Sequence, residues 1–230
     1  MTEDRRLHPR IWHTDWLLLR GLNRLLADNI ARHVPKGVTL VDLGCGTMPY
    51  RPMVEASGIR YIGADIDNNA ELRIDRDGHV PLGDGSAGAL LSVQVLEHVG
   101  DLDNYCAEIR RLMADDATLL LSTHGTWLYH PHPEDHRRWT RTGLVAELAT
   151  RGLATEEIFA VMGPLATTTV IRSTGFAFVV RRLPLFGNML AGTIAAFMNA
   201  RAWLEDKITP IGMRDDNACV YLVRARKAAA

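Results

Sequence analysis

The chain has 230 residues, of which 47% are hydrophobic, and this is enough for one domain with a sizeable buried core. Its 26 Lys and Arg residues nearly balance its 27 Asp and Glu residues, which argues against a nucleic-acid partner because such binding depends on clustered basic side chains. The three scattered cysteines, Cys45, Cys106 and Cys219, indicate free thiols in a reducing compartment, and the polar first residues lack the apolar core of a signal peptide. We therefore expect a cytoplasmic protein.

Residues 1–35 are predicted to form an N-terminal helical segment. Apolar side chains recur there at intervals of three and four residues, at Trp16, Leu19, Leu22, Leu26 and Ile30. Thr14 stands where a helix-capping residue is expected, and Pro35 follows the end of the pattern. We expect the helix to cover one face or edge of a sheet; the alternative is that it closes over a ligand, with Trp12, His13 and Trp16 at the entrance.

A buried parallel strand is predicted within Val38–Thr47, because an apolar run with β-branched residues ends there in a Gly-X-Gly turn. Gly44, Cys45 and Gly46 form that turn, where the backbone can approach a ligand closely. A dinucleotide fingerprint needs a third glycine, which is missing, and Asp42 would repel a diphosphate. The carboxylate suits a cofactor that carries an ammonium and a sulfonium group at this point, and S-adenosylmethionine has this chemistry.

The following elements place further polar residues at the ends of strands. Strands are predicted at 60–65, 72–75, 89–95, 117–122, 156–161 and 218–224, and helices at 49–57 and 143–151. Asp65 lies about 20 residues beyond Gly46, the spacing at which an acidic side chain accepts hydrogen bonds from ribose hydroxyls. After the strand at 89–95 we expect His98 to lie near the cofactor while Glu97 braces the loop; an acid-base pair is the alternative.

Three segments, Val41–Thr47, Tyr61–Asp67 and Ser92–Val99, resemble the signature segments of class I S-adenosylmethionine-dependent methyltransferases, of the type-11-like group, in their order and spacing. The resemblance covers residues 36–160. It implies an α/β fold with a Rossmann-like, doubly wound, seven-stranded sheet whose last strand is antiparallel, and S-adenosylmethionine as the cofactor. The cofactor-binding residues that it implies are Asp42, Gly44, Cys45, Gly46, Asp65, Ile66, Asp77, Gly78, Gln94, Val95 and His98, with Asp75 as the competitor of Asp77 beside the adenine.

The segment after the strand at 117–122 is rich in histidine and carboxylate side chains. It contains His124, His130, Glu134, and the four residues that we take as candidate catalytic residues, His132, Asp135, His136 and His124 itself. Three functions compete: a metal site, a structural loop and a general base. The spacing matches no established ligand pattern, so no metal is expected, whereas a neutral imidazole can take a proton from a hydroxyl near pH 7. Arg138 is expected to pair with a carboxylate, and 135–140 resembles methyltransferases of sugar and polysaccharide pathways.

Residues 163–216 are predicted to be an insertion between the last two strands, because roughly 55 residues separate them and a hairpin loop needs only a few. The stretch 183–198 is nearly uncharged, but it is too short and too broken by glycines for a membrane span. We expect a helical lid over the site, or a homodimer contact through 183–206; peripheral contact of this stretch with a membrane is the alternative. The resulting division is a helical segment (1–35), a cofactor-binding core (36–162), the lid insertion (163–216), and the last strand and tail (217–230).

The sequence thus predicts an O-methyltransferase with a histidine general base that acts on a small or lipid-linked acceptor, such as a sugar. Two alternatives remain open. One is a methyltransferase-like module that binds the cofactor without turnover. The other is a nucleotide-dependent oxidoreductase, which Asp42 and the missing third glycine disfavour.

Overall fold

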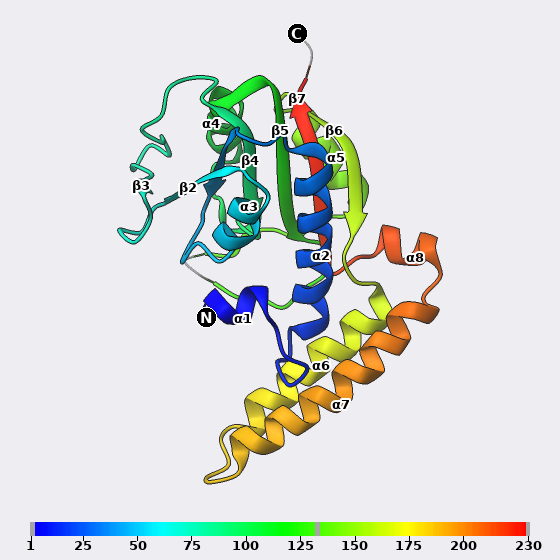
Figure 1. Ribbon diagram of the computed structural model, residues 1–230. Coiled ribbons are helices and arrows are strands. Elements are labelled where there is room, and N and C mark those ends of the chain that lie inside the picture. The colour runs from blue at the N-terminus through cyan, green and yellow to red at the C-terminus, as the bar shows by residue number, and fades with distance from the viewer. Residues whose placement is uncertain (1–2, 132–133, 229–230) are drawn as a thin grey trace.

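The computed structural model describes residues 3–131 and 134–228 and contains a mixed sheet of seven strands (Figure 1). The strands are β1 (Thr39–Leu43), β2 (Arg60–Asp65), β3 (Leu72–Arg73), β4 (Ala87–Val93), β5 (Met113–His124), β6 (Leu153–Ala160) and β7 (Val220–Lys227). They lie in the order β3-β2-β1-β4-β5-β7-β6, and β7 runs antiparallel to both of its neighbours while the other pairs are parallel. The predicted fold class, a Rossmann-like α/β fold with an antiparallel last strand, is confirmed.

Helices cover both faces of this sheet. One face packs against α2 (Trp16–His33) and α3 (Arg51–Ala56), and the other against α4 (Leu102–Leu112) and α5 (Arg141–Ala149). Because successive strand residues point to opposite faces, Leu91 of β4 belongs to the core layer beneath α2, and its neighbour Leu90 belongs to the layer beneath α4. Both side chains are fully buried, and the central strands therefore read as continuous apolar runs in the sequence.

The long N-terminal helix begins slightly later than predicted. The N-cap of α2 is Asp15, and its side chain makes no capping hydrogen bond because it accepts one from Arg5 instead, at 2.8 Å. Thr14 is therefore not the cap, and that prediction was wrong. The apolar stripe was predicted correctly, since Leu22, Leu26 and Ile30 are fully buried against the sheet.

A short helix, α1 (Glu3–Leu7), is fastened to α2. In addition to the ion pair between Arg5 and Asp15, the side-chain amide of Asn23 donates to the carbonyl oxygens of Arg6, at 2.8 Å, and Leu7, at 3.0 Å. These bonds fix the position of Arg6 relative to the sheet, which matters for the site described below.

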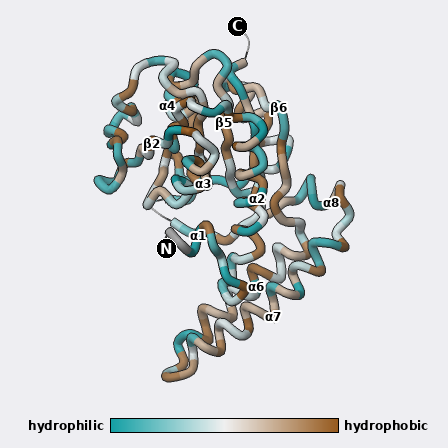
Figure 2. The backbone as a smooth tube through the Cα atoms, in the orientation of Figure 1, coloured by the Kyte–Doolittle hydropathy of each residue, from teal (hydrophilic) through white to brown (hydrophobic). Residues whose placement is uncertain are grey.

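Between β6 and β7 the chain forms α6 (Pro164–Val180), α7 (Gly187–Ile208) and α8 (Ile211–Asp216). Helices α6 and α7 pack side by side as a hairpin that extends away from the sheet (Figure 1), and hydrophobic residues follow it to its distal turn (Figure 2). The Asn199 amide of α7 donates to the carbonyl oxygens of Ile11 and His13, at 2.7 Å each, and so ties the hairpin to the N-terminal segment. The length and the apolar character that a membrane-crossing helix needs do not occur together in any helix of the described residues.

Candidate functional site

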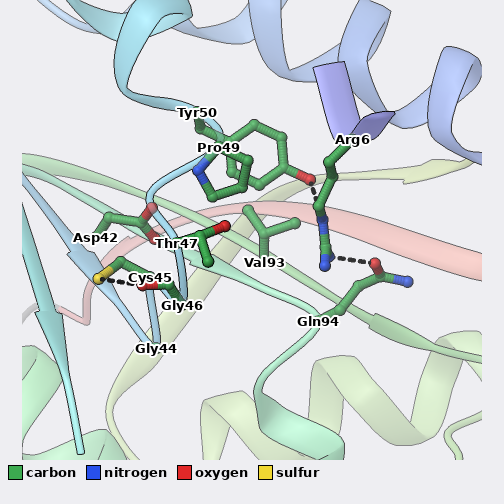
Figure 3. A pocket seen from close by; sticks show the side chains of 10 residues that line it. All are labelled: Arg6, Asp42, Gly44, Cys45, Gly46, Thr47, Pro49, Tyr50, Val93 and Gln94. Carbon is green, nitrogen blue, oxygen red and sulfur yellow. Dashed lines mark hydrogen bonds between the residues drawn. The ribbon is translucent and has the colours of Figure 1, made fainter. Parts of the chain in front are cut away.

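A cleft opens at the carboxyl ends of β1, β2, β4 and β5. Two adjoining cavities form it, one of about 930 Å³ and one of about 250 Å³. Both are lined by Arg6, Gly44, Gly46 and Gln94, so they are parts of the same cleft. Figure 3 shows the smaller cavity, beside the turn that follows β1. In an open α/β sheet, ligands bind at this edge.

The turn after β1 owes its shape to two glycines. Gly44 has a φ of 72°, and a Cβ atom there would lie 2.6 Å from Cγ2 of Val95, so no side chain fits. Gly46 has a φ of 53°, and a Cβ atom there would meet nothing within 4 Å. Between them, Cys45 is buried, and burial raises the pKa of its thiol to about 12. The turn therefore presents backbone and open space to a ligand, with no reactive group of its own.

The smaller cavity contains one side chain of each charge. Asp42 is only 2% exposed and accepts a hydrogen bond from the Tyr61 hydroxyl at 2.6 Å; burial raises the pKa of its carboxyl to about 7. Arg6 reaches in from α1, donating to the Tyr50 hydroxyl at 3.1 Å and to Oε1 of Gln94 at 2.5 Å (Figure 3). A cavity with a carboxylate and a guanidinium suits the ammonium and the carboxylate of an α-amino acid group.

The larger cavity begins at the carboxyl end of β2. Asp65 lies there, 8% exposed, and its two oxygens accept the backbone N–H groups of Gly46, at 2.7 Å, and Asp67, at 3.1 Å. Each carboxylate oxygen has a second lone pair for a ligand hydroxyl. The next residue, Ile66, lines the same cavity and exposes more than half of its side chain, which gives a flat ligand an apolar surface.

Asp77 and Gly78 line the same cavity farther from the turn. The carbonyl oxygen of Asp77 accepts a hydrogen bond from the Asn104 amide at 2.6 Å, and Gly78 has a φ of 80°, which favours glycine. The competitor Asp75 uses one carboxylate oxygen to hold this turn, since it accepts the N–H groups of Asp77, at 3.0 Å, and His79, at 2.8 Å.

A buried acid and a buried imidazole meet at the inner end of the cleft. Oε1 of Glu97 lies 3.3 Å from Nε2 of His124, and Oε2 of Glu97 accepts a hydrogen bond from the Thr123 hydroxyl at 2.8 Å. Burial raises the pKa of Glu97. Burial, with the nearby His130 and Arg138, lowers the pKa of His124 well below its usual range, so this imidazole is neutral at pH 7.

Three further aromatic rings surround His124 and complete what we call the histidine cluster. His124 stacks on Trp127, with ring centroids 5.8 Å apart and planes within 5°, and His130 meets it edge-on at 4.9 Å. His98 lies 5.0 Å from His130, and its Nδ1 is hydrogen-bonded to the carbonyl oxygen of Glu134. All four rings line the larger cavity, together with Gln94 and Val95.

The other predicted catalytic residues lie elsewhere. Asp135 forms a two-pronged ion pair with Arg138, which holds the pKa of its carboxyl far below the usual range and makes it a brace. His136 pairs with Glu134 at 2.9 Å. Neither Asp135 nor His136 lines the two cavities, and His132 lies outside the described residues. The loop turns the side chains of Asp135 and His136 toward partners of their own, and a catalytic role for these two residues stays a prediction.

One group within residues 3–131 and 134–228 has the composition of a metal site. The ligand atoms of Glu97, His124 and His130 lie within 4.8 Å of one another, and two of the buried atoms, Oε1 of Glu97 and Nδ1 of His124, have no hydrogen-bond partner. Two imidazoles and a carboxylate are a donor set for divalent transition metals. The sequence pointed to no metal, because Glu97 follows a different strand from the two histidines and their spacing forms no motif.

The cleft wall also includes residues that the sequence did not assign to the site. Arg6, Asp15, Leu18 and Leu19 come from the N-terminal segment and cover the site, whereas Trp12, Trp16 and His13 do not line the two cavities. The lining of these cavities contains no residue of the insertion 163–216 either. The segment before and within the start of α2 therefore forms part of the cleft wall, and the lid role of 163–216 stays a prediction from the sequence.

Comparisons with known proteins agree with this geometry. The family model of a methyltransferase domain matches residues 18–158, more than half of the chain. A comparison with curated proteins found no match.

Solved structures with the same fold include the [4+2]-cyclase SpnF, with a TM-score of 0.59 and 18% identity over 90% of this chain and 82% of that one. A geranyl diphosphate methyltransferase in complex with S-adenosylmethionine has a TM-score of 0.56 and 16% identity, covering 94% and 90% of the two chains. An S-adenosylmethionine-dependent methyltransferase from Mesorhizobium loti has a TM-score of 0.56 and 16% identity, covering 96% and 100%. The chain belongs to the methyltransferase-domain family, and it is an S-adenosylmethionine-dependent methyltransferase.

Proposed function

We propose that the protein transfers the methyl group of S-adenosylmethionine to a hydroxyl oxygen of a small or lipid-linked acceptor, such as a sugar, with His124 as the general base. The observation that carries this proposal is a neutral imidazole in the wall of the cleft. Its Nε2 lies 3.3 Å from a buried carboxyl oxygen of Glu97, and its Nδ1 has no hydrogen-bond partner among residues 3–131 and 134–228.

The cofactor supplies a methyl group that its sulfonium already makes electrophilic, so the protein has to hold it, align the acceptor and remove a proton. In this proposal Arg6 binds the carboxylate of the amino acid group and Asp42 its ammonium, while Asp65 accepts hydrogen bonds from the ribose hydroxyls. Ile66, Asp77 and Gly78 form the wall on the adenine side, and the lining Gln94, Val95 and His98 face the reacting end. The half-buried rings of Trp127, His130 and His98 around His124 limit the access of water.

The proton of the acceptor hydroxyl passes to the unprotonated ring nitrogen of His124 in this scheme. Oε1 of Glu97 and the side-chain amide nitrogen of Gln94 each lie 3.3 Å from Nε2, and the Glu97 carboxyl stabilises the imidazolium as it forms. The lowered pKa of His124 keeps the imidazole neutral at pH 7, with one ring nitrogen able to accept a proton.

The direct test is a binding measurement followed by an acceptor screen. We expect S-adenosylhomocysteine to bind in calorimetry, more tightly than NAD, and a radiolabelled methyl group to reach a hydroxyl compound. Binding without transfer to any acceptor would favour a non-catalytic module, and tighter binding of NAD would favour an oxidoreductase. Methyl transfer has to be measured directly because the fold does not fix the reaction: SpnF, which shares the fold, is a cyclase.

The acceptor class rests on two features. The stretch 135–140 resembles methyltransferases of sugar and polysaccharide pathways, and the insertion carries an apolar surface through 183–206 that suits a lipid-linked acceptor, a membrane or a second copy of the chain. The cytoplasmic location and the division into the segments 1–35, 36–162, 163–216 and 217–230 remain predictions from the sequence.

The ionisation of Asp42 predicts a pH dependence of cofactor binding. Because burial raises the pKa of its carboxyl to about 7, the group is largely protonated at pH 6 and largely ionised at pH 8. Only the ionised form attracts an ammonium, so the affinity for S-adenosylhomocysteine should rise about tenfold from pH 6 to pH 8. Calorimetry at both values measures this, and the Asp42→Asn variant should bind more weakly with a flatter profile. A flat profile in the unmodified protein would contradict the assigned role.

Chelation distinguishes a base from a metal site in the histidine cluster. If His124 acts as a free imidazole, prolonged dialysis against EDTA should leave the methylation rate unchanged, within about twofold, because no step depends on an ion. The measurement is the rate before dialysis, after it, and after adding back Zn²⁺, Mn²⁺ or Mg²⁺. Loss of the rate and its recovery with one of these ions would assign Glu97, His124 and His130 to a metal instead.

A further inference from the structure

We infer that the distal end of the α6–α7 hairpin attaches the protein to an anionic lipid surface. We call residues 176–190 the hairpin tip; they comprise the end of α6, the connecting turn and the start of α7. Eight large apolar side chains are exposed on it: Phe176, Phe178, Val179, Leu183, Leu185, Phe186, Met189 and Leu190. The hairpin carries this tip away from the sheet (Figure 1), so the surface projects from the body of the protein.

Small side chains form the contact between the two helices, and large apolar side chains lie on their outer faces. The buried positions between them include Ser173, Ala177, Gly187, Ala191 and Ala195. At Gly187 a Cβ atom would lie 2.7 Å from the carbonyl oxygen of Val180, so the helices meet too closely there for a side chain. In a helix exposed to water, the outer face carries the polar residues. Here large apolar residues face outward instead, and this arrangement suits an apolar environment.

The turn itself exposes its most apolar residue. Leu185 is 95% exposed and has a φ of 65°, a left-handed conformation that leucine disfavours and that glycine or asparagine adopts readily. Pro184 precedes it and restricts the turn further. If the turn only connected two helices in water, a glycine or asparagine would be favoured over leucine at this position.

The charge around the tip selects the kind of surface. Residues 164–204 contain four arginines, Arg172, Arg181, Arg182 and Arg201, and no acidic residue. Arg181 and Arg182 lie directly before the turn, both exposed, and the Arg182 guanidinium lies 4.7 Å over the ring of Phe178. Apolar side chains that insert to a shallow depth, with arginines beside them, bind anionic lipid headgroups.

The same charges disfavour a second copy of the chain as the occupant. A symmetric dimer places equivalent surfaces against each other, so the arginines beside the turn would come close to their own copies. The tip has no acidic residue to pair with them. The surface of a bilayer with negatively charged headgroups has the charge that complements these arginines.

Attachment would orient the cleft as well. Asn199 ties α7 to Ile11 and His13, and the chain continues from there to Leu18 and Leu19, which line the larger cavity. The hairpin, the N-terminal segment and the cleft wall are thus connected in sequence and by hydrogen bonds. Delivery of a lipid-linked acceptor to this wall rests on the proposed function, whereas attachment itself does not.

The test is cosedimentation of the full chain with vesicles of phosphatidylcholine, alone or with phosphatidylglycerol. We expect at least about tenfold stronger binding to the vesicles with phosphatidylglycerol, and weaker binding at high salt. Combined replacement of Leu185, Phe186 and Met189 by serine should reduce binding to both vesicle types at least about tenfold. Replacing Arg181 and Arg182 by glutamate should remove the preference for phosphatidylglycerol.

A matched control replaces Ile211 and Met213 by serine, because both are exposed apolar residues of α8 outside the tip; their loss should leave vesicle binding unchanged. Thermal unfolding and S-adenosylhomocysteine binding, measured without vesicles, show that each variant is folded. The inference is overturned if the unmodified protein does not sediment with phosphatidylglycerol vesicles. It is also overturned if ultracentrifugation shows a dimer that the combined variant Leu185→Ser, Phe186→Ser and Met189→Ser disrupts, since the tip would then bind a second copy. Methyl transfer in the absence of vesicles tests the proposed reaction separately.

Discussion

Replacing His124 by asparagine should lower kcat for methyl transfer by about 100-fold to 10,000-fold, the range that a positioned general base contributes. Asparagine retains a polar side chain beside Glu97 but cannot take up a proton. His124 lies at the end of β5, is 2% exposed, and has no proposed contact with the cofactor. The affinity for S-adenosylhomocysteine should therefore change by less than about threefold. Single-turnover kinetics with an identified acceptor measures the first quantity, and calorimetry the second.

The matched control for this prediction is His136→Asn. It removes an imidazole from the same loop, but this imidazole pairs with Glu134 and does not line the cavities, so kcat should stay within about twofold. A His124→Asn variant that keeps the full rate would show that His124 is not the base. Equal losses in both variants would point to a disturbed loop instead of a missing base.

Replacing Asp65 by alanine should weaken S-adenosylmethionine binding by at least about tenfold, because each hydrogen bond to a charged group contributes about 1.5–3 kcal/mol. The carboxylate lies at the end of β2, where it also accepts the N–H group of Gly46, so the variant loses both a ligand contact and a support of the turn. Equilibrium dialysis or calorimetry gives the affinity.

Two variants separate these contributions. Asp67→Ala removes a carboxylate two residues farther on that also lines the larger cavity but supports no part of the turn after β1, so it should weaken binding far less than Asp65→Ala does. Asp65→Asn keeps an acceptor for the Gly46 N–H group but loses the charge, so it should bind with an intermediate affinity. An Asp65→Ala variant of unchanged affinity would mean that the ribose hydroxyls are held elsewhere.

The turn after β1 and the strands could be predicted from the sequence, because they depend on residues that are neighbours in the chain. The turn after β1 is a local feature, because Gly44 and Gly46 both adopt a positive φ that favours glycine. The strands were found as apolar runs, and β2 has the predicted bounds, Arg60–Asp65. The end of β1 and the end of β2 are brought together by parallel pairing, which the fold class already implied.

The role of Arg6 could not be predicted in this way. It reaches the cleft because Asn23 of α2 holds the backbone of α1, and because Tyr50 and Gln94 offer partners from other parts of the fold. None of these contacts leaves a pattern in the sequence around Arg6. The place of this arginine follows only from how α1 and α2 pack on the finished sheet.

The histidine-rich segment shows the same limit. Its composition indicated a function, but four imidazoles were equivalent in the sequence, and only pairing of β4 with β5 places His124 beside Glu97. Likewise, the insertion was predicted from its length, whereas its direction depends on the Asn199 hydrogen bonds and could not be read from its composition. Site residues that depend on tertiary contacts were therefore the ones missed or misplaced.

The place of β7 affects how the protein is made. β6 joins the sheet only by pairing with β7, and β7 lies between β5 and β6 although the whole insertion separates it from β6 in the chain. During translation, β5 must therefore wait with an unpaired edge while the ribosome synthesises the three helices of the insertion. The nascent polypeptide is open to association with other chains throughout this interval, and chaperones that shield apolar edges should bind it then.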